Sequence, residues 1–308
     1  ASVPQIESRY PLWDNPEVIA ATRRTDGLLG EAHDDRREIL GTGIQSGRPE
    51  QVIRVSTSTW LPILAAFTIA VLLAGFITSQ YWLSILMLIP LIGLFLHWVW
   101  TTGDRHAPVE IEVAPGLRLP TQASARNAPG WWALVGTLLI DGSLFASLVF
   151  AYFYLWLNAP VWPAGGATVM ALTPALVALA PLALPLFASW LGPAALAAGR
   201  LRTAIVWQAV AITGGALFLS LHLPALWAAV GAPQVHAYAS VVWTLAGFHA
   251  VHVVVAMLVG GFTATRIQCG YVDAVRSLES RIAAAFWRYT VGIGVITWAV
   301  LHLFPRWV

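Results

Sequence analysis

The sequence predicts an all-α, polytopic membrane protein, with seven transmembrane helices arranged as a two-helix unit and a five-helix bundle. Its composition favours this class: 58% of the 308 residues are hydrophobic and 10% are charged, whereas roughly 25% of the residues in a soluble domain are charged. The mean hydropathy of +0.70 agrees with a membrane protein. The formal net charge of +2 is too small to indicate a nucleic-acid partner.

Seven apolar runs account for the predicted helices. Each run is long enough for an α-helix to cross roughly 30 Å of hydrocarbon, and a helix satisfies its backbone polar groups within a single segment. The runs cover residues 59–78, 81–100, 130–157, 170–196, 203–222, 239–264 and 283–304.

Two polar segments divide the chain into its parts. Residues 1–58 lack an apolar run and are predicted to form a cytoplasmic tail, and residues 101–129 contain helix-breaking Pro and Gly and are predicted to form a cytoplasmic loop. They leave a two-helix transmembrane unit at 59–100 and a five-helix bundle at 130–308. The one cysteine, Cys269, excludes an intrachain disulfide and a cysteine-based metal cluster.

The distribution of arginine predicts the orientation of the helices. The tail, the loop at 101–129 and alternate connections after it carry arginines, whereas the connections at 78–80, 158–169 and 223–238 contain no Lys or Arg. Short cytoplasmic connections are enriched in positive charge. We therefore expect a cytoplasmic N-terminus and a C-terminus on the other side of the membrane.

Asp141 is the most informative single residue. It interrupts the apolar run 131–154, roughly 15 Å along the helix from Trp131 at 1.5 Å per residue. It alone among the fifteen acidic residues lies inside an apolar run. An ionisable side chain at this depth indicates a functional site by default; the alternative is a protonated acid that hydrogen-bonds only for packing.

His249 and His252 form a second polar feature, inside the run 239–264. A separation of three residues places both imidazoles on one face of a helix. They are candidates for a hydrogen-bond anchor between helices, for a proton-linked or assembly role, or for haem or metal ligation. The last is disfavoured, because the other membrane-level histidines lie at the ends of their runs: His97, His222 and His302.

Asp141 and the two histidines are predicted to meet. A low dielectric disfavours a charged carboxylate, so we expect Asp141 to be protonated. A protonated acid donates one hydrogen bond and a neutral imidazole nitrogen accepts one. The predicted intramembrane polar site is therefore Asp141 with His249 or His252, with no catalytic residue and no metal.

Two motifs carry a resemblance to a known family. Residues 247–253 read Gly-Phe-His-Ala-Val-His-Val, and Asp141 is followed by Phe145, by Tyr152-Phe153-Tyr154 and by Trp162-Pro163. With these motifs, the five predicted spans from residue 130 onward resemble subunit III of haem–copper cytochrome c oxidases, most strongly over residues 131–266. The resemblance has departures: the family usually has Glu where this chain has Asp141, and its Trp-His-Phe-x-Asp reads Trp-Arg-Tyr-Thr-Val at 287–291.

The N-terminal region resembles a different part of the same complex. Residues 10–14 (Tyr-Pro-Leu-Trp-Asp) and 36–42 (Arg-Arg-Glu-Ile-Leu-Gly-Thr) are similar to the C-terminal extension of subunit I in caa3-type oxidases. There the catalytic subunit carries two additional helices and subunit III has five. We therefore expect this chain to be part of a fused subunit I–III product, or a subunit III that has acquired the helix pair.

The resemblance implies a non-catalytic subunit of a proton-pumping terminal cytochrome c oxidase in the bacterial inner membrane. Its partners would be oxidase subunits I and II, with haem and copper in those subunits and none in this chain. It would support proton uptake and limit inactivation of the catalytic subunit. The alternatives are the equivalent subunit of a quinol oxidase or nitric oxide reductase, and a proton-coupled transporter that uses Asp141 and the histidines as a relay.

A bound phospholipid is also expected. The long loop leaves the helix pair free to diverge from the bundle, and subunit III of the family holds lipid in such a cleft. Arginine can bind a phosphate bidentately and Trp side chains favour the interface. The predicted lipid-binding residues are Trp98, Trp100, Arg105 and Arg266.

Overall fold

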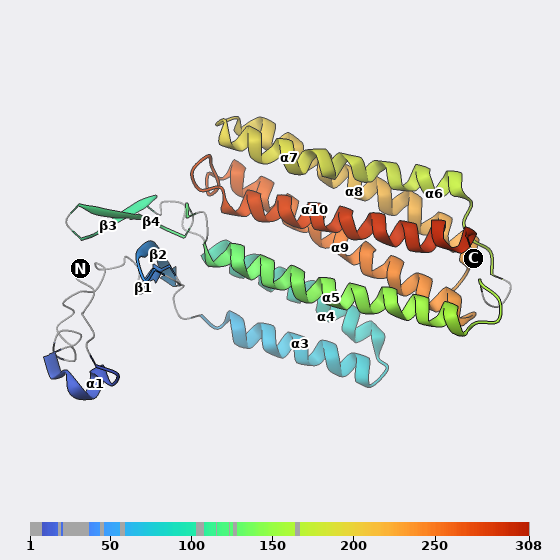
Figure 1. The fold of residues 1–308 in the computed structure, drawn as a ribbon, viewed down its shortest axis with the longest axis horizontal. Helices are drawn as coiled ribbons and strands as arrows, with labels where there is room; N and C mark the ends of the chain where they lie inside the picture. The colour runs from blue at the N-terminus through green and yellow to red at the C-terminus, as the bar shows by residue number, and fades with distance from the viewer. Residues whose placement is uncertain are drawn as a thin grey trace. The chain divides into compact units, whose positions relative to one another are not determined.

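The computed structural model describes residues 8–17, 20, 37–43, 46–55, 59–102, 108–114, 116–122, 124–125, 128–163 and 167–307 (Figure 1). The described chain is mostly helical. It forms two compact units, Ala1–Ala125 and Arg126–Val308, which are described separately below.

The first unit contains a pair of apolar helices. After the short α1 (Pro11–Asp14), the pair consists of α3 (Leu61–Ile77) and α4 (Tyr81–Thr102). The three residues between α3 and α4 reverse the chain, so the two helices pack side by side. Ser84 of α4 donates a 2.8 Å hydrogen bond from its hydroxyl to the carbonyl of Leu72 in α3, which fixes the contact between them.

The polar segments on either side of this helix pair contain two antiparallel β-hairpins. The first pairs β1 (Arg37–Thr42) with β2 (Pro49–Val55), and the second pairs β3 (Glu110–Ala114) with β4 (Leu117–Pro120). We call these two hairpins the β module. The prediction of an all-α chain is wrong for these segments, because few residues of these short strands face a core, and their alternating pattern is therefore weak.

The two hairpins of the β module are joined to each other. The side-chain carbonyl of Gln122 accepts from the backbone N–H of Arg54 at 2.8 Å, and its amide group donates to the carbonyl of Arg54 at 3.1 Å. Val52 is fully buried and packs with Val113 and Leu119. Segments from before α3 and after α4 therefore share one small core.

The second unit is a helical bundle. It begins with α5, and its second span is α6 continued through the 3-10 turn η3 into α7. Later, α10 continues through the π-helix η4 into η5. The elements are α5 (Pro129–Asn158), α6 (Leu172–Leu179), η3 (Ala180–Leu182), α7 (Ala183–Ala197), α8 (Leu201–Val230), α9 (Ala237–Gln268), α10 (Leu278–Trp298), η4 (Ala299–Leu303) and η5 (Phe304–Arg306).

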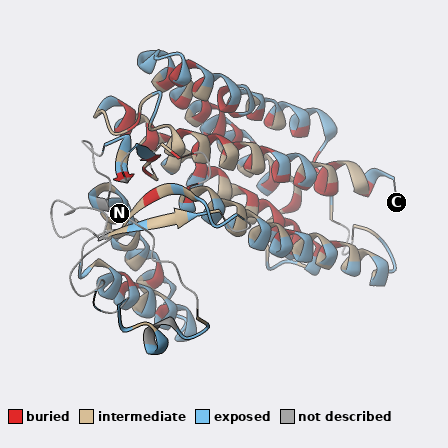
Figure 2. Cartoon of the chain, turned by 60° about the vertical axis from the view of Figure 1, so that its left-hand side comes forward, coloured by how far each residue is buried: buried red, intermediate tan, exposed pale blue. Residues whose placement is uncertain are grey.

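The length and apolar character of these helices define a multi-pass membrane protein. Six helices in the described chain, namely α4, α5, α6–α7, α8, α9 and α10 with its extension, are long and apolar enough to cross a membrane. The helix α3 is a shorter apolar helix of 17 residues. Large apolar side chains cover the outer faces, and buried residues lie where the bundle helices face one another (Figure 2).

Each long helix of the bundle packs against at least two of the others. Contacts join α5 to α9 and α10, α7 to α8 and α10, and α9 to α8 and α10. Glycines allow the closest approaches: Gly214 of α8 lies directly against the Pro181–Pro185 segment, and Gly215 lies against Trp287 of α10. In a membrane, such small residues permit the close packing that holds helices together.

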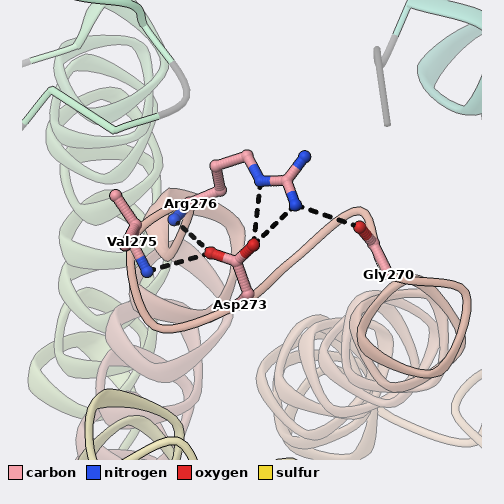
Figure 3. A network of polar contacts seen from close by, with 4 residues as sticks. All are labelled: Gly270, Asp273, Val275 and Arg276. Atoms are coloured by element: carbon pink, nitrogen blue, oxygen red, sulfur yellow. Dashed lines mark hydrogen bonds and ion pairs between the residues drawn. The ribbon is translucent and has the colours of Figure 1, made fainter. Parts of the chain in front are cut away.

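The connection between α9 and α10 is held by Asp273 (Figure 3). One carboxylate oxygen accepts from the backbone N–H groups of Val275 and Arg276 at 2.9 and 2.8 Å, and the other accepts from the Arg276 guanidinium at 2.6 and 3.0 Å. The guanidinium also donates to the carbonyl of Gly270 at 3.3 Å. Burial would raise the pKa of Asp273, but these donors outweigh it and lower the pKa below its ordinary value of 3.8.

We expect Asp273→Asn to loosen this connection, because the amide cannot pair with the Arg276 guanidinium. At neutral pH, trypsin should cleave after Arg276 faster in the variant than in the wild type. The matched control is Glu112→Gln, which removes an exposed carboxylate from β3 and should leave this cleavage unchanged.

The pH dependence follows from the lowered pKa of Asp273. A carboxylate with a lowered pKa stabilises the fold above its unfolded value and loses this effect as the pH falls through its folded value. Hydrogen exchange of the amides in 270–277 should therefore differ between wild type and Asp273→Asn at neutral pH. The two should converge in acid, below pH 3.8. A difference that persists there would contradict the assignment.

Candidate functional site

Asp141, His252 and Tyr289 meet between three helices of the bundle. Asp141 lies on α5, His252 on α9 and Tyr289 on α10. The Nε2 atom of His252 lies 3.0 Å from Oδ2 of Asp141, and the hydroxyl of Tyr289 donates to the same oxygen at 2.5 Å. We call these three residues the polar triad. It links α5, α9 and α10 through polar side chains.

The hydrogen bonds of His252 restrict where its protons are. Its Nδ1 atom lies 2.7 Å from the backbone carbonyl of Phe248, and a carbonyl can only accept, so Nδ1 carries a proton. The other nitrogen, Nε2, faces Asp141. One proton therefore lies between His252 and Asp141, either on the acid or on the imidazole, while every other hydrogen bond of the triad stays the same.

The surroundings of the triad are aromatic and partly shielded. The side chains of Asp141 and His252 are 22% and 12% exposed. The His252 ring lies 4.4 Å from that of Phe248 and 6.0 Å from that of Phe286, measured between centroids. In such a setting hydrogen bonds are electrostatically stronger than in water, and unpaired polar groups are costly. The triad can thus hold α5 to α9 and α10, and it can pass one proton between two groups.

His249 occupies a different environment from His252. It is 1% exposed, its ring lies 4.9 Å from that of Phe218 on α8, and it packs closely against Gly294 of α10. Among the contacts of the described residues, none joins His249 to Asp141. Of the two predicted partners for Asp141, the structure brings His252 to it and places His249 in the packed interior.

His222 and His302 form a buried pair that the sequence analysis missed. Their Nε2 atoms are 3.2 Å apart, and the residues are 3% and 1% exposed. The apolar runs predicted both histidines to lie at the ends of their spans, and this was wrong for His222, because α8 continues to Val230, two turns further. The apolar pattern that continues past residue 222 was the signal that could have located it.

The histidine pair links α8 to the π-helix η4, which contains His302. A contact between two imidazole nitrogens needs one proton, because one nitrogen must donate and the other accept. Within the residues that the structure describes, no group of three or more His, Cys, Asp or Glu side chains could hold a metal ion. The absence of a metal in the functional protein stays a prediction.

Arg266 does not match its predicted role as a lipid ligand. It is 3% exposed, and its Nε donates to a carboxylate oxygen of Glu279 at 2.7 Å. Its guanidinium also lies 4.4 Å from the ring centroid of Tyr271. Because a buried cation requires a counter-charge, the arginine pairs with an acid on α10 rather than presenting itself to a lipid phosphate.

The other predicted lipid ligands belong to the first unit. Trp98 and Trp100 are half-buried side chains of α4, and the Trp98 ring stacks with that of Phe95 at 6.4 Å between centroids. Arg105 lies outside the described residues. Lipid at Trp98 and Trp100 stays a prediction.

An aromatic cluster lies at the end of α5 away from Trp131. Tyr152 is fully buried, and its hydroxyl accepts from the indole N–H of Trp162 at 3.2 Å. The rings of Tyr238 and Phe304 lie 6.4 and 6.2 Å from that of Tyr152. This cluster joins the end of α5, the connection after it, α9 and η5, and it includes Tyr152, Phe153 and Trp162 of the motif that follows Asp141.

No family model and no curated protein matched this chain. A functional proposal for it therefore depends on its residues and on the contacts they make.

Proposed function

We propose that this chain is a non-catalytic, subunit III-like component of a proton-pumping terminal cytochrome c oxidase. One observation supports the proposal most directly. Asp141 and the string 247–253 carry the resemblance to that family, and they meet in the bundle through the 3.0 Å contact of Asp141 with His252. Two motifs separated by about a hundred residues therefore contribute to one polar contact between α5 and α9.

Two of the residues at which this chain departs from the family pattern, Asp141 and Tyr289, contact each other in the polar triad. Asp141 is one methylene shorter than the Glu that the family usually has. Tyr289 stands where the family string on the last helix has Phe, and its hydroxyl donates to Asp141. The additional hydroxyl therefore gives the shorter acid a second hydrogen-bond partner from α10.

In this role the chain acts through its partners. Oxidase subunits I and II would carry the haem and copper, and this chain would stabilise the catalytic subunit and support its proton uptake. The membrane would be a bacterial inner membrane, with the N-terminus cytoplasmic and the C-terminus on the other side. The polar triad would keep α5, α9 and α10 together during turnover, since its side chains contact one another across these three helices.

Purification of the chain from its native membrane in a mild detergent tests this assignment. We expect it to co-purify with a haem-bearing catalytic subunit, recognised by its absorbance spectrum. The same chain expressed alone should show no haem absorbance and no stoichiometric copper. Stoichiometric haem or copper in the isolated chain would overturn the non-catalytic role, and a native preparation without any haem protein would favour the transporter alternative.

A further inference from the structure

A pocket with two arginines opens between α5, α7 and α10. Its volume is about 220 Å³. At roughly 30 Å³ per water molecule, this is room for a phosphate group rather than for a single water. The pocket lies within the second unit and is separate from the polar triad. It is lined by Trp131, Ser189, Trp190, Pro193, Arg281, Ala284 and Arg288.

Each arginine of the pocket lies over a tryptophan ring. The guanidinium carbon of Arg281 is 5.0 Å from the ring centroid of Trp131, and that of Arg288 is 4.5 Å from the ring centroid of Trp190. Such a contact uses the flat face of the guanidinium, whereas its N–H groups point outward in its plane. The stacking thus holds both guanidinium groups in place without using their N–H groups, which are the groups that bind anions.

The spacing along α10 brings the two arginines together. Seven residues are nearly two helical turns, so Arg281 and Arg288 lie on the same face, roughly 10 Å apart along the axis. Side chains of an α-helix lean toward its N-terminus. Both arginines line the same pocket, and both side chains lean toward the end of the helix that we expect at the cytoplasmic surface.

Arg288 lies within an apolar helix without a carboxylate partner. No ion pair joins it to an acid among the residues that the structure describes. The three acids of the second unit have other partners: Asp141 contacts His252 and Tyr289, Asp273 pairs with Arg276, and Glu279 pairs with Arg266. A positive charge within a membrane-spanning segment is costly unless it is paired, so a counter-anion from outside the chain would stabilise this arrangement.

The surface around the pocket favours a lipid as the source of that anion. On α7, Trp190 is 61% exposed, Phe187 is 60% exposed and Leu191 is 43% exposed. This apolar surface would contact acyl chains next to a bound headgroup. A free anion in water would gain nothing from it.

We propose that this pocket binds the phosphate of an anionic phospholipid between the Arg281 and Arg288 guanidinium groups. The site differs from the lipid site expected near Trp98 and Trp100, and it does not depend on the oxidase assignment. Arg288 stands where the family string has His, so the site is specific to this chain rather than implied by the resemblance.

Native mass spectrometry of the full chain in detergent tests the site with two lipids, phosphatidylglycerol and phosphatidylcholine. The wild type should bind phosphatidylglycerol more tightly. Arg288→Gln and Arg281→Gln should each weaken that binding about tenfold, which corresponds to about 1.4 kcal/mol. Arg288→Lys keeps the charge but loses the planar fork, so it should recover part of the affinity.

The matched control is Arg202→Gln, which removes an exposed arginine from the first turn of α8 and should change binding less than about twofold. An equal loss in this control would show non-specific attraction to surface charge and overturn the site. Displacement of the lipid by millimolar inorganic phosphate would assign the pocket to a free anion instead. A partner's carboxylate in the pocket, in a structure of an assembled complex, would likewise contradict the lipid.

The thermal midpoint of each variant without lipid shows whether it is folded. If Arg288→Gln fails to fold, Arg281→Gln still tests the same pocket, because Arg281 is nearer the helix end. Retention of full phosphatidylglycerol affinity by a folded Arg281→Gln would then overturn the proposal.

Discussion

Replacement of Asp141 by alanine is expected to destabilise the bundle by about 1–3 kcal/mol. The change removes the shared partner of His252 Nε2 and of the Tyr289 hydroxyl, and both groups then stay in a poorly solvated site. It also removes the link that holds α5 to α9 and α10. Thermal unfolding of the chain in detergent, followed by tryptophan fluorescence, measures the loss.

Asp141→Asn is the matched control for this change. The asparagine carbonyl can accept from Tyr289, and its amide group can donate to the unprotonated Nε2 of His252. We expect this variant to keep most of the stability that the alanine variant loses. A loss as large as that of Asp141→Ala would show that the acidic proton itself, and not the hydrogen bonds, stabilises the bundle.

The proposed role predicts a different effect of Asp141→Ala on activity. In an assembled oxidase, the initial rate of oxygen reduction should stay within about twofold, a barrier change of only ~0.4 kcal/mol. The active complex should lose activity sooner during turnover, because the supporting bundle is looser. Immediate loss of most activity in an intact complex would place Asp141 on the obligatory proton path.

The second large effect is expected from Gly214→Ala. A Cβ atom at Gly214 would lie 2.6 Å from Cδ of Pro185, 2.8 Å from Cβ of Leu184 and 2.8 Å from the carbonyl oxygen of Pro181. These are a proline ring atom, a Cβ atom and a backbone atom, none of which can rotate away about a side-chain bond. The helix α8 must then move from the α6–α7 span, and such overpacking typically costs about 1–3 kcal/mol.

Gly292→Ala provides the comparison for Gly214→Ala. It makes the same chemical change on α10, where a Cβ atom would meet no other atom within 4 Å. There the more restricted backbone of alanine should stabilise the helix by about 0.5–1 kcal/mol. Thermal midpoints that shift in opposite directions would support the close approach at Gly214, and equal shifts would contradict it.

The helices were predictable from the sequence because an apolar run of twenty residues is a strong, local signal. The ends of the helices were predicted less well: the run ending at His222 was about two turns too short, since α8 continues to Val230 through Pro224, a residue that usually ends a helix. The strands of the β module were not predictable, because only Val52 and a few other residues face its small core.

The sequence predicted which residues form the site better than it predicted the contacts between them. Asp141 and His252 were both named from the sequence, but the choice between His249 and His252 depends on the rotation of α9 about its axis. The contribution of Tyr289 depends on how α10 is turned toward α5. The rotations of α9 and α10 about their axes depend on packing among several helices. The sequence of one segment alone therefore does not determine them.

The β module also has a consequence for the order of assembly during synthesis. Its first hairpin is complete once residue 55 has left the ribosome, whereas Gln122, which joins the two hairpins through Arg54, is made after both α3 and α4. Domains form progressively from the N-terminus as a chain is synthesised. Closure of the module therefore cannot precede the translation of the helix pair, and it ties the two helix ends together as a late step in the biogenesis of this unit.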